Sequence, residues 1–320
     1  MPTNTTPRTK AFIALHSAVF LWGFTAILGK LISYGSLYLV WHRMAITAAI
    51  YLLIPAVWKQ LKSLSLKTTL NFAGIGLIVC AHWITFYGSI KLGNSVSITL
   101  ACLGSASFFA AIIEPTILRK PYSLRDILMG LIVMLGIVLI YFSLPVQPAA
   151  TAAQPNLSYG WAIITGIVSA ALAATFTTLN KKHITTAPTL AISTIEMMSG
   201  AIFLCLIILL FPMGDYQAFP ALNMDALNLQ NLRTGPWDFI WIGLLALLCT
   251  NLTFYLGTYA LKQLSAFTAN LTVNLEPIYG IVLGALIFKE NEDLNLWFYL
   301  GTSLILGAIF TQAYLSSKEN

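Results

Sequence analysis

Ionisable side chains lie deep inside the long apolar segments of this chain, where water is scarce. The residues at such depth are Arg43, His42, His82, Glu196 and Glu276. An ionisable group in the core of a bilayer costs several kcal/mol, so it normally faces a partner or a water-filled cavity. We therefore expect these residues to belong to a site that binds ions, protons or polar solutes.

Glu276 is the strongest candidate, because it lies near the middle of an apolar segment and is followed directly by Pro277. Proline removes one backbone donor and frees the carbonyl of Val273, so a kink with local polar groups is expected. A carboxyl group at this depth is suited to taking and releasing a proton. Asn270 and Asn274 share one face of this helix, and Glu276 lies toward the other.

Polar residues also recur at helical spacing in four other segments, so that each set shares one face of a helix. The sets are Arg43, Thr47 and Tyr51; His82, Thr85 and Ser89; Ser193, Glu196 and Gly200; and Asn251, Tyr255 and Thr258. Such stripes are typical of cavity walls, although hydroxyl groups also hold closed bundles together. His82 equally suits a structural hydrogen bond, and Trp22 and Tyr255 are candidate aromatic walls.

Two roles remain open for Arg43. Its planar guanidinium suits a structural ion pair with Glu196 or Glu276, and it equally suits the carboxylate or phosphate of a substrate.

The elements that carry these residues are membrane spans. The chain is 58% hydrophobic and only 9% charged, and its mean hydropathy is +0.81. Apolar runs of about 20 residues match the thickness of a bilayer. We predict an all-α integral membrane protein with spans at 11–33, 37–58, 69–91, 94–117, 124–143, 158–180, 188–211, 237–261, 265–288 and 294–315.

An internal repeat organises these spans. A shift of 171 residues aligns Lys262 with Lys91, Glu276-Pro277 with Ser105-Ala106, Gly301 with Gly130 and Gly307 with Gly136. Five helices per copy is an odd number, so the second copy is expected to be inverted, as in secondary transporters. The predicted units are a first repeat at 1–143, a Pro/Ala linker at 144–157, a second repeat at 158–315, a long extracytoplasmic loop at 212–236 and a tail at 316–320.

The distribution of Lys and Arg predicts the orientation. With both termini in the cytoplasm, twelve of these residues fall on the inner side and four on the outer side, as the positive-inside rule requires. The net charge of +6 thus indicates topology and not a nucleic-acid partner. The four cysteines show no CxxC spacing, and no phosphate-binding loop is present, so neither a metal nor a cofactor is predicted.

The chain resembles the EamA branch of the drug/metabolite transporter superfamily over nearly its whole length. The resemblance is carried by Leu21-Trp22-Gly23 leading to Lys30, by Glu276-Pro277, and by Phe288-Lys289-Glu290. It implies a carrier of the plasma membrane, here a bacterial inner membrane, that exports amino acids, nucleosides or other small metabolites through a central cavity. In the first half Ala106 stands opposite Pro277 and Arg119 opposite Glu290, so the two halves depart from functional symmetry.

We therefore expect a proton-coupled exporter of amino acids or related metabolites that works by alternating access, as a monomer or a homodimer. Arg43 suits a carboxylate, and Glu276 suits an amine or a proton. The alternatives are an exporter of nucleosides, purines or drugs, and, more remotely, a membrane-embedded enzyme or a receptor. An enzyme would need a catalytic constellation near the interface, which the spans do not contain.

Overall fold

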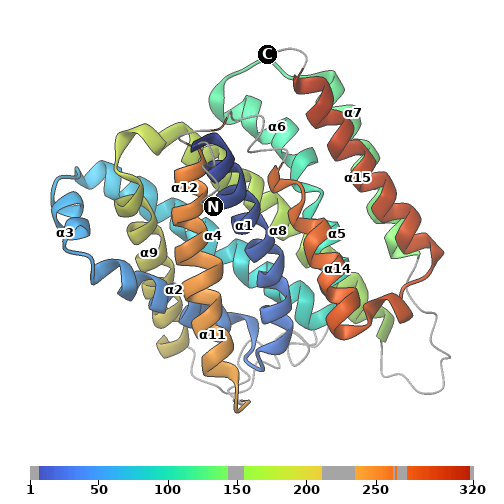
Figure 1. The fold of residues 1–320 in the computed structure, drawn as a ribbon, viewed down its shortest axis with the longest axis horizontal. Coiled ribbons are helices and arrows are strands. Elements are labelled where there is room, and N and C mark those ends of the chain that lie inside the picture. The colour runs from blue at the N-terminus through green and yellow to red at the C-terminus, as the bar shows by residue number, and fades with distance from the viewer. Residues whose placement is uncertain (1–6, 143–154, 211–234, 262–263, 265–271, 318–320) are drawn as a thin grey trace, which may run out of the picture.

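The computed structural model describes residues 7–142, 155–210, 235–261, 264 and 272–317, which form helices joined by short turns, with no strand among them (Figure 1). The first half contains α1 (Pro7–Leu31), α2 (Ser36–Leu52), α3 (Pro55–Lys62), α4 (Leu66–Gly93), α5 (Val96–Leu103), α6 (Ala106–Leu118) and α7 (Leu124–Tyr141). The second contains α8 (Pro155–His183), η1 (Ile184–Thr186), α9 (Thr189–Leu210), α11 (Asp238–Ala246), the π-helix η2 (Leu247–Leu252), α12 (Thr253–Leu261), α14 (Glu276–Phe288), η3 (Glu290–Glu292) and α15 (Leu296–Ser317).

Seven of these segments are long and apolar enough to cross a bilayer, namely 8–31, 66–93, 96–118, 124–141, 159–186, 189–210 and 238–257. An eighth is the pair α2 and α3, which is bent by 93° at residues 53–54. Two shorter apolar helices, Glu276–Phe288 and Leu296–Gln312, lie where the ninth and tenth spans are predicted. Helix α8 begins at Pro155, within the last residues of the predicted linker 144–157. Most of the linker, most of the loop 212–236 and residues 318–320 lie outside the described residues.

Local sequence explains where several helices begin and end. Ser65, Ser95 and Ser123 each accept a hydrogen bond from the backbone N–H three residues later, which caps α4, α5 and α7. Three non-glycine residues with positive φ lie just past helix ends: Asn94 after α4, Arg119 after α6 and Lys289 after α14. The left-handed conformation is a common way to end a helix.

The helix bounds correct one detail of the repeat. Helices α6 and α14 each contain 13 residues and end on left-handed Arg119 and Lys289, so their bounds are 170 residues apart, not 171. Glu276 therefore stands opposite Ala106, and Glu290 opposite Lys120. In both halves this span is broken just before these helices, at Gly104–Ser105 and at residues 274–275.

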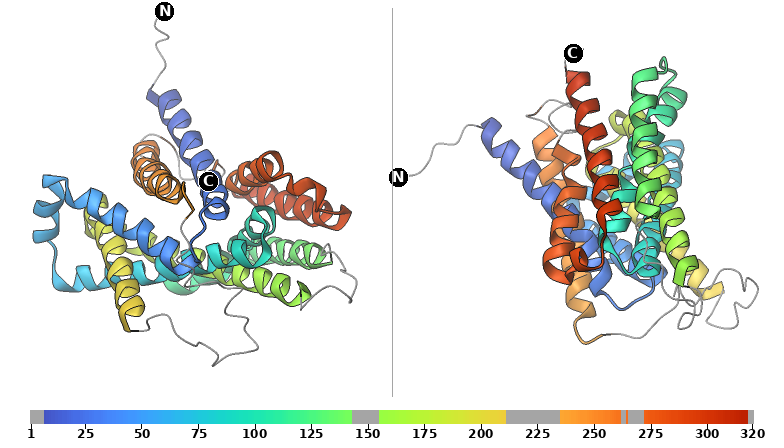
Figure 2. Two further views of the ribbon diagram at one scale, coloured as in Figure 1. Left: turned by 90° about the horizontal axis from the view of Figure 1, so that it is seen from below. Right: turned by 90° about the vertical axis from the view of Figure 1, so that its right-hand side faces the viewer.

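The first helix of each half packs against helices of the other half. Helix α1 packs against α12 and α14, and α8 packs against α4, α5 and α6. Helix α2 packs on α9, and α7 packs on α15 along the edge of the bundle opposite to α3 (Figure 1). Each contact between α1 and the second half thus has a counterpart between α8 and the first half. The views in Figure 2 show the same interleaved bundle from two further directions.

Glycines permit the closest crossings. A Cβ atom at Gly23 of α1 would lie 3.0 Å from the backbone nitrogen of Gly280 and 3.1 Å from the carbonyl oxygen of Glu276. Gly280 also lies against Leu100 of α5, and Gly284 against Ser97 and Glu290. The GxxxG sequence of α14 therefore serves packing inside one chain, where small residues let helix backbones approach.

Candidate functional site

Arg43 of α2 is buried between the two halves, with 3% of its surface exposed. Its Nη1 donates to the Tyr87 hydroxyl at 2.7 Å, and its Nε donates to the Thr250 hydroxyl at 3.0 Å. Its Nη2 lies 3.5 Å from the Cys249 carbonyl oxygen. The guanidinium carbon is 3.8 Å from the ring centroid of Trp83, so one face of the cation rests on an indole.

The π-helix η2 explains how a helical segment offers a carbonyl and a hydroxyl to Arg43. A π-turn widens the helix, and such turns often occur at functional sites. The Thr250 hydroxyl of η2 donates to the carbonyl of Leu245 in α11, five residues earlier, and the Thr253 hydroxyl of α12 donates to the carbonyl of Cys249 in η2. Local side chains therefore satisfy the irregular backbone that faces Arg43.

Arg43 has no acidic partner among the described residues. The ion pairs found there are Lys30–Glu290, Lys120–Glu114, Lys181–Glu114, Arg125–Asp126 and Lys289–Glu292. The ion pair considered from the sequence, with Glu196 or Glu276, is not among them. The buried guanidinium is held by neutral groups alone in this part of the chain.

Glu276 lies in the first turn of α14, at the break before this helix, and Pro277 occupies the start of the helix. The carboxylate forms no hydrogen bond or ion pair with any described residue, but it interacts electrostatically with Arg43. Its backbone lies at the close crossing of α1 and α14 at Gly23. The Arg43 and Glu276 side chains thus come from different halves and lie within electrostatic range of each other.

His82 of α4 contacts α8. Its Nδ1 lies 2.9 Å from both the carbonyl oxygen and the hydroxyl of Ser169, and the Ser169 hydroxyl also donates to the His82 carbonyl. The ring packs near Phe86 and Phe176. His82 therefore links α4 to α8 by hydrogen bonds, which is the structural role considered for it from the sequence.

Glu196 of α9 is 6% exposed, and its Oε1 has no hydrogen-bond partner. The side chain of Asn180 in α8 and the Tyr51 phenol of α2 both interact with the carboxyl group. Asn180 Oδ1 also lacks a partner. The Glu196 carboxyl group is therefore buried and only partly satisfied.

The remaining predicted residues are scattered. Asn251 of η2 donates from Nδ2 to the carbonyl of Ala246 at the end of α11, and its Oδ1 has no partner. Tyr255 is 68% exposed on the surface of the bundle. Trp22 packs in an apolar cluster with Leu15, Val19 and Ala260, and Asn274 lies half-buried in the turn before α14. Asn270 lies outside the described residues.

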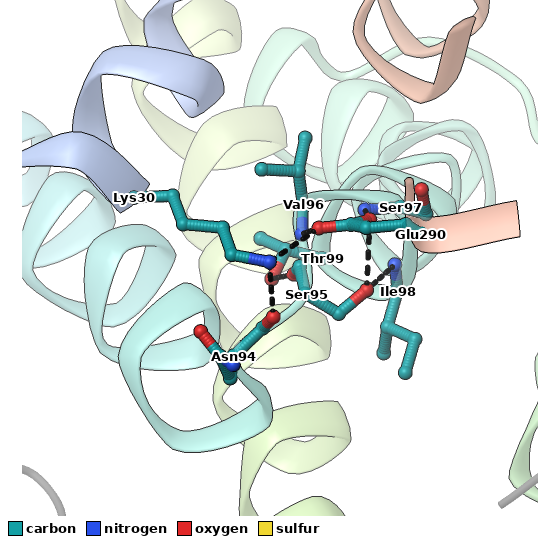
Figure 3. Close-up of polar contacts among 8 residues, drawn as sticks. All are labelled: Lys30, Asn94, Ser95, Val96, Ser97, Ile98, Thr99 and Glu290. Atoms are coloured by element: carbon teal, nitrogen blue, oxygen red, sulfur yellow. Dashed lines mark hydrogen bonds and ion pairs between the residues drawn. The ribbon is translucent and has the colours of Figure 1, made fainter. Parts of the chain in front are cut away.

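At one end of the bundle, Glu290 of η3 joins the halves through four groups (Figure 3). Its Oε1 lies 2.9 Å from Lys30 Nζ of α1 and accepts from the Val96 N–H at 2.9 Å. Its Oε2 accepts from the Ser97 N–H at 2.9 Å and from the Ser95 hydroxyl at 3.2 Å. The carboxylate thus caps the N-terminus of α5 from the opposite half, and Lys30 also donates to the Asn94 carbonyl.

The electrostatics of Glu290 follow from these contacts. Burial alone would raise the pKa of its carboxyl group, but the hydrogen bonds from Lys30, Ser97 and Val96 together hold that pKa below its usual value. Two further contacts reinforce this end of the molecule. Buried Asp238 accepts from the Ser33 and Gly235 N–H groups, and Lys91 donates to the Ile32 carbonyl.

The opposite end carries a looser counterpart. Glu114 of α6 pairs with Lys181 of α8 at 2.7 Å and with Lys120 at 3.3 Å. The Glu114 side chain is 31% exposed and both lysines are 54% exposed, whereas those of Glu290 and Lys30 are 5% and 15% exposed. At each end of the bundle, a lysine near the C-terminus of the first helix of one half pairs with a carboxylate of the other half. Only the Lys30–Glu290 pair is shielded from solvent.

Several residues around Arg43 were missed by the sequence patterns. Trp83 and Tyr87 stand at i and i+4 on α4, next to the chosen stripe of His82, Thr85 and Ser89. This spacing was a usable signal. No such spacing could have identified Thr250, because the π-turn of η2 alters which side chains face inward.

The comparisons with known proteins agree with this architecture. The EamA-like transporter family matches residues 9–142 and 160–312. A similar fold occurs in a solved structure titled only as the crystal structure of a protein, with a TM-score of 0.60, 12% identity, and coverage of 97% of this chain and 98% of that chain. No curated protein sequence matches. Because the family covers both helical halves, the chain belongs to the EamA-like transporter family.

Proposed function

We propose that this membrane transporter is a secondary carrier that exports amino acids or related zwitterionic metabolites across the bacterial plasma membrane, in exchange for protons and by alternating access. The observation that carries the proposal is the buried guanidinium of Arg43. It has neutral partners alone among the described residues and interacts electrostatically with the unpartnered Glu276.

This arrangement suits a zwitterion. A buried charge without a counter-ion is costly, and a substrate carboxylate would supply that counter-ion to Arg43. The substrate ammonium group would in turn supply one to Glu276. Charged groups at this depth typically mark substrate or ion pathways, and broken helices from both halves commonly form the site in transporters.

The two ends of the bundle support the alternating-access part of the proposal. In the orientation expected from the Lys and Arg distribution, the Lys30–Glu290 end is extracytoplasmic and the Glu114–Lys181 end is cytoplasmic. The ion pair at the first end is buried, and the ion pair at the second end is partly exposed to solvent. This difference is expected of a carrier that is closed toward the outside.

Flux across liposomes tests the proposal. The protein is reconstituted with a pH-sensitive dye inside the vesicles, and gradients of single amino acids, nucleosides and purines are imposed. We expect proton movement with a subset of amino acids. Arg43→Lys and Glu276→Gln should each reduce amino-acid flux at least tenfold, because each removes a specific charge contact. Glu292→Gln is the matched control and should transport like the wild type, because Glu292 is an exposed carboxylate in a surface pair with Lys289.

Two results would overturn the assignment. Flux of nucleosides alone, unchanged by Arg43→Lys, would favour the rival class of substrate, for which the exposed part of the Trp83 ring would be the binding surface. Amino-acid flux without proton movement would make the protein a facilitator. In the rival case Trp83→Leu should abolish flux and Glu276→Gln should not.

A further inference from the structure

We propose that Glu196 is the proton-binding site of this carrier and that it is distinct from the Arg43–Glu276 pair. The inference rests on the proposed function for its role in coupling. The part of the proposal that concerns the protein alone is that the Glu196 carboxyl group is protonated inside the bundle at neutral pH. This part does not depend on the identity of the substrate.

The Glu196 carboxyl group lies where α9 packs closely on α2 and α4. Helix α9 packs on α4 at Gly76, where an added Cβ atom would overlap the Glu196 backbone and the Ser199 hydroxyl. It packs on α2 at Gly200, where an added Cβ atom would overlap Met44. Asn180 approaches from α8. Because these crossings exclude side chains larger than hydrogen, the group is kept out of water.

The buried groups around Glu196 include more hydrogen-bond acceptors than donors. Glu196 Oε1 and Asn180 Oδ1 are both buried acceptors without a partner. An ionised carboxylate has no donor to offer to the amide oxygen. When the carboxylate takes one proton from the water phase it becomes a neutral carboxylic acid, whose O–H can donate to an acceptor. One proton therefore removes both the uncompensated charge and an unsatisfied acceptor, each of which is costly when buried.

Among the residues that the structure describes, no cation lies close enough to Glu196 to form an ion pair with an ionised carboxylate. Tyr51 is the titratable group that interacts with it electrostatically, and a phenol is neutral near pH 7. The other titratable or charged groups on the packed elements are Tyr38, His42 and Arg43 on α2, Lys67, Cys80, His82, Tyr87 and Lys91 on α4, Tyr159, Lys181, Lys182 and His183 on α8, and the exposed Lys59 and Lys62 on α3.

A proton is favoured over a larger cation by the amide. The side chain of Asn180 interacts with the carboxyl group, and a metal ion or a substrate ammonium at the same place would meet its amide N–H donors. The proton needs no additional ligands and no volume. The site is therefore specific for the smallest cation.

Helix α2 connects this site to Arg43. Arg43, Thr47 and Tyr51 lie at i, i+4 and i+8 on one face of α2, and the buried Thr47 hydroxyl has no partner. Gain or loss of charge at Glu196 acts on Tyr51, and the substrate would act on Arg43 two turns away. The same helix would respond to both, and it bends by 93° just beyond Tyr51.

Infrared difference spectroscopy of the reconstituted protein at pH 7 tests proton binding without any substrate. We expect a C=O stretching band of a protonated carboxyl group that is absent from Glu196→Gln and present in Glu114→Gln. Asn180→Ala should shift the frequency of the band, because it removes the acceptor of the O–H. A band that persists in Glu196→Gln, or no band in the wild type, would overturn the proposal.

Flux then separates this inference from the proposed function. Glu196→Gln should keep substrate exchange between the two sides of the vesicle but lose substrate-linked proton movement, to the level of protein-free liposomes. Glu276→Gln should lose both. If the wild type transports no compound of the panel, the proposed function fails while the infrared result still decides the proton site. Proton movement retained by a folded Glu196→Gln protein would refute the coupling role.

Discussion

Glu290 and Glu196 are both almost fully buried carboxyl groups that lie between helices of different halves, and their surroundings are opposite. Glu290 receives a lysine, two backbone N–H groups and a hydroxyl, which together satisfy both of its oxygens. Glu196 has one amide neighbour and an oxygen without a partner. Burial alone therefore says little about the role of a carboxyl group in this protein.

The contrast separates a structural charge from a reactive one. A carboxylate that accepts several hydrogen bonds favours its ionised form, and it holds the donors in place. A carboxyl group with too few donors gains by binding a proton or a cation. The first kind of site resists titration and fastens helices, and the second is suited to change its charge during a working cycle.

The largest effect is expected from removing Glu290. Glu290→Ala leaves Lys30 buried and unpaired and leaves the N–H groups of Val96 and Ser97 without an acceptor, which should cost about 3–5 kcal/mol. Thermal unfolding in detergent should show a clearly lower Tm. Glu292→Ala is the matched control, because its pair with exposed Lys289 is a surface contact worth about 0–1 kcal/mol.

A double variant sharpens this result. Lys30→Met combined with Glu290→Gln removes both charges and keeps an acceptor for α5, so it should be more stable than Lys30→Met alone. If Glu290→Ala unfolds at the wild-type temperature, the contact between the halves does not stabilise the fold.

The pH dependence of stability gives the next effect. Because the pKa of Glu290 is lower in the folded protein than its ordinary value of 4.5, folding favours the ionised form. This contribution is fully present above pH 4.5 and is lost as the pH falls through the folded pKa. The Tm difference between wild type and Glu290→Gln should be constant from pH 5 to about 7 and should shrink below pH 4.5. A difference that grows on acidification would contradict the geometry.

The smallest effect on stability is expected at Glu196. Glu196→Gln replaces an incompletely satisfied acid by a neutral group of the same shape, which should leave stability unchanged or raise it by about 1 kcal/mol. The same detergent assay that shows the loss for Glu290→Gln provides the comparison. A loss as large as that of Glu290→Ala would mean that Glu196 is a satisfied structural charge, and the contrast would disappear.

Much of the helical arrangement follows from local properties of the sequence. Apolar length alone locates α4 and α7 to within three residues, because bilayer thickness sets the length of each span. The Glu276-Pro277 pair indicates a disturbed helix, and the break lies directly before it. The position of the second repeat was wrong by one residue around α14, because a single shift cannot follow turns of different length.

The site itself depends on contacts that no local pattern encodes. Glu290 lies 193 to 195 residues from the groups it caps, and Arg43 lies 207 residues from Thr250. The sequence indicated that Arg43 needs a partner but not that the partners would be an indole, a phenol and a π-turn. Depth in a span identifies a costly group, and the three-dimensional packing determines how that cost is met.

The interleaved packing of the halves has a consequence for how the molecule is assembled. Helix α1 finds its main neighbours in α12 and α14, and α8 finds its own in α4, α5 and α6. Neither half alone would cover the faces of these helices. The two halves of the chain therefore behave like the subunits of an obligate heterodimer that a linker connects. If the halves were encoded separately, they would be expected to form the carrier only when synthesised together.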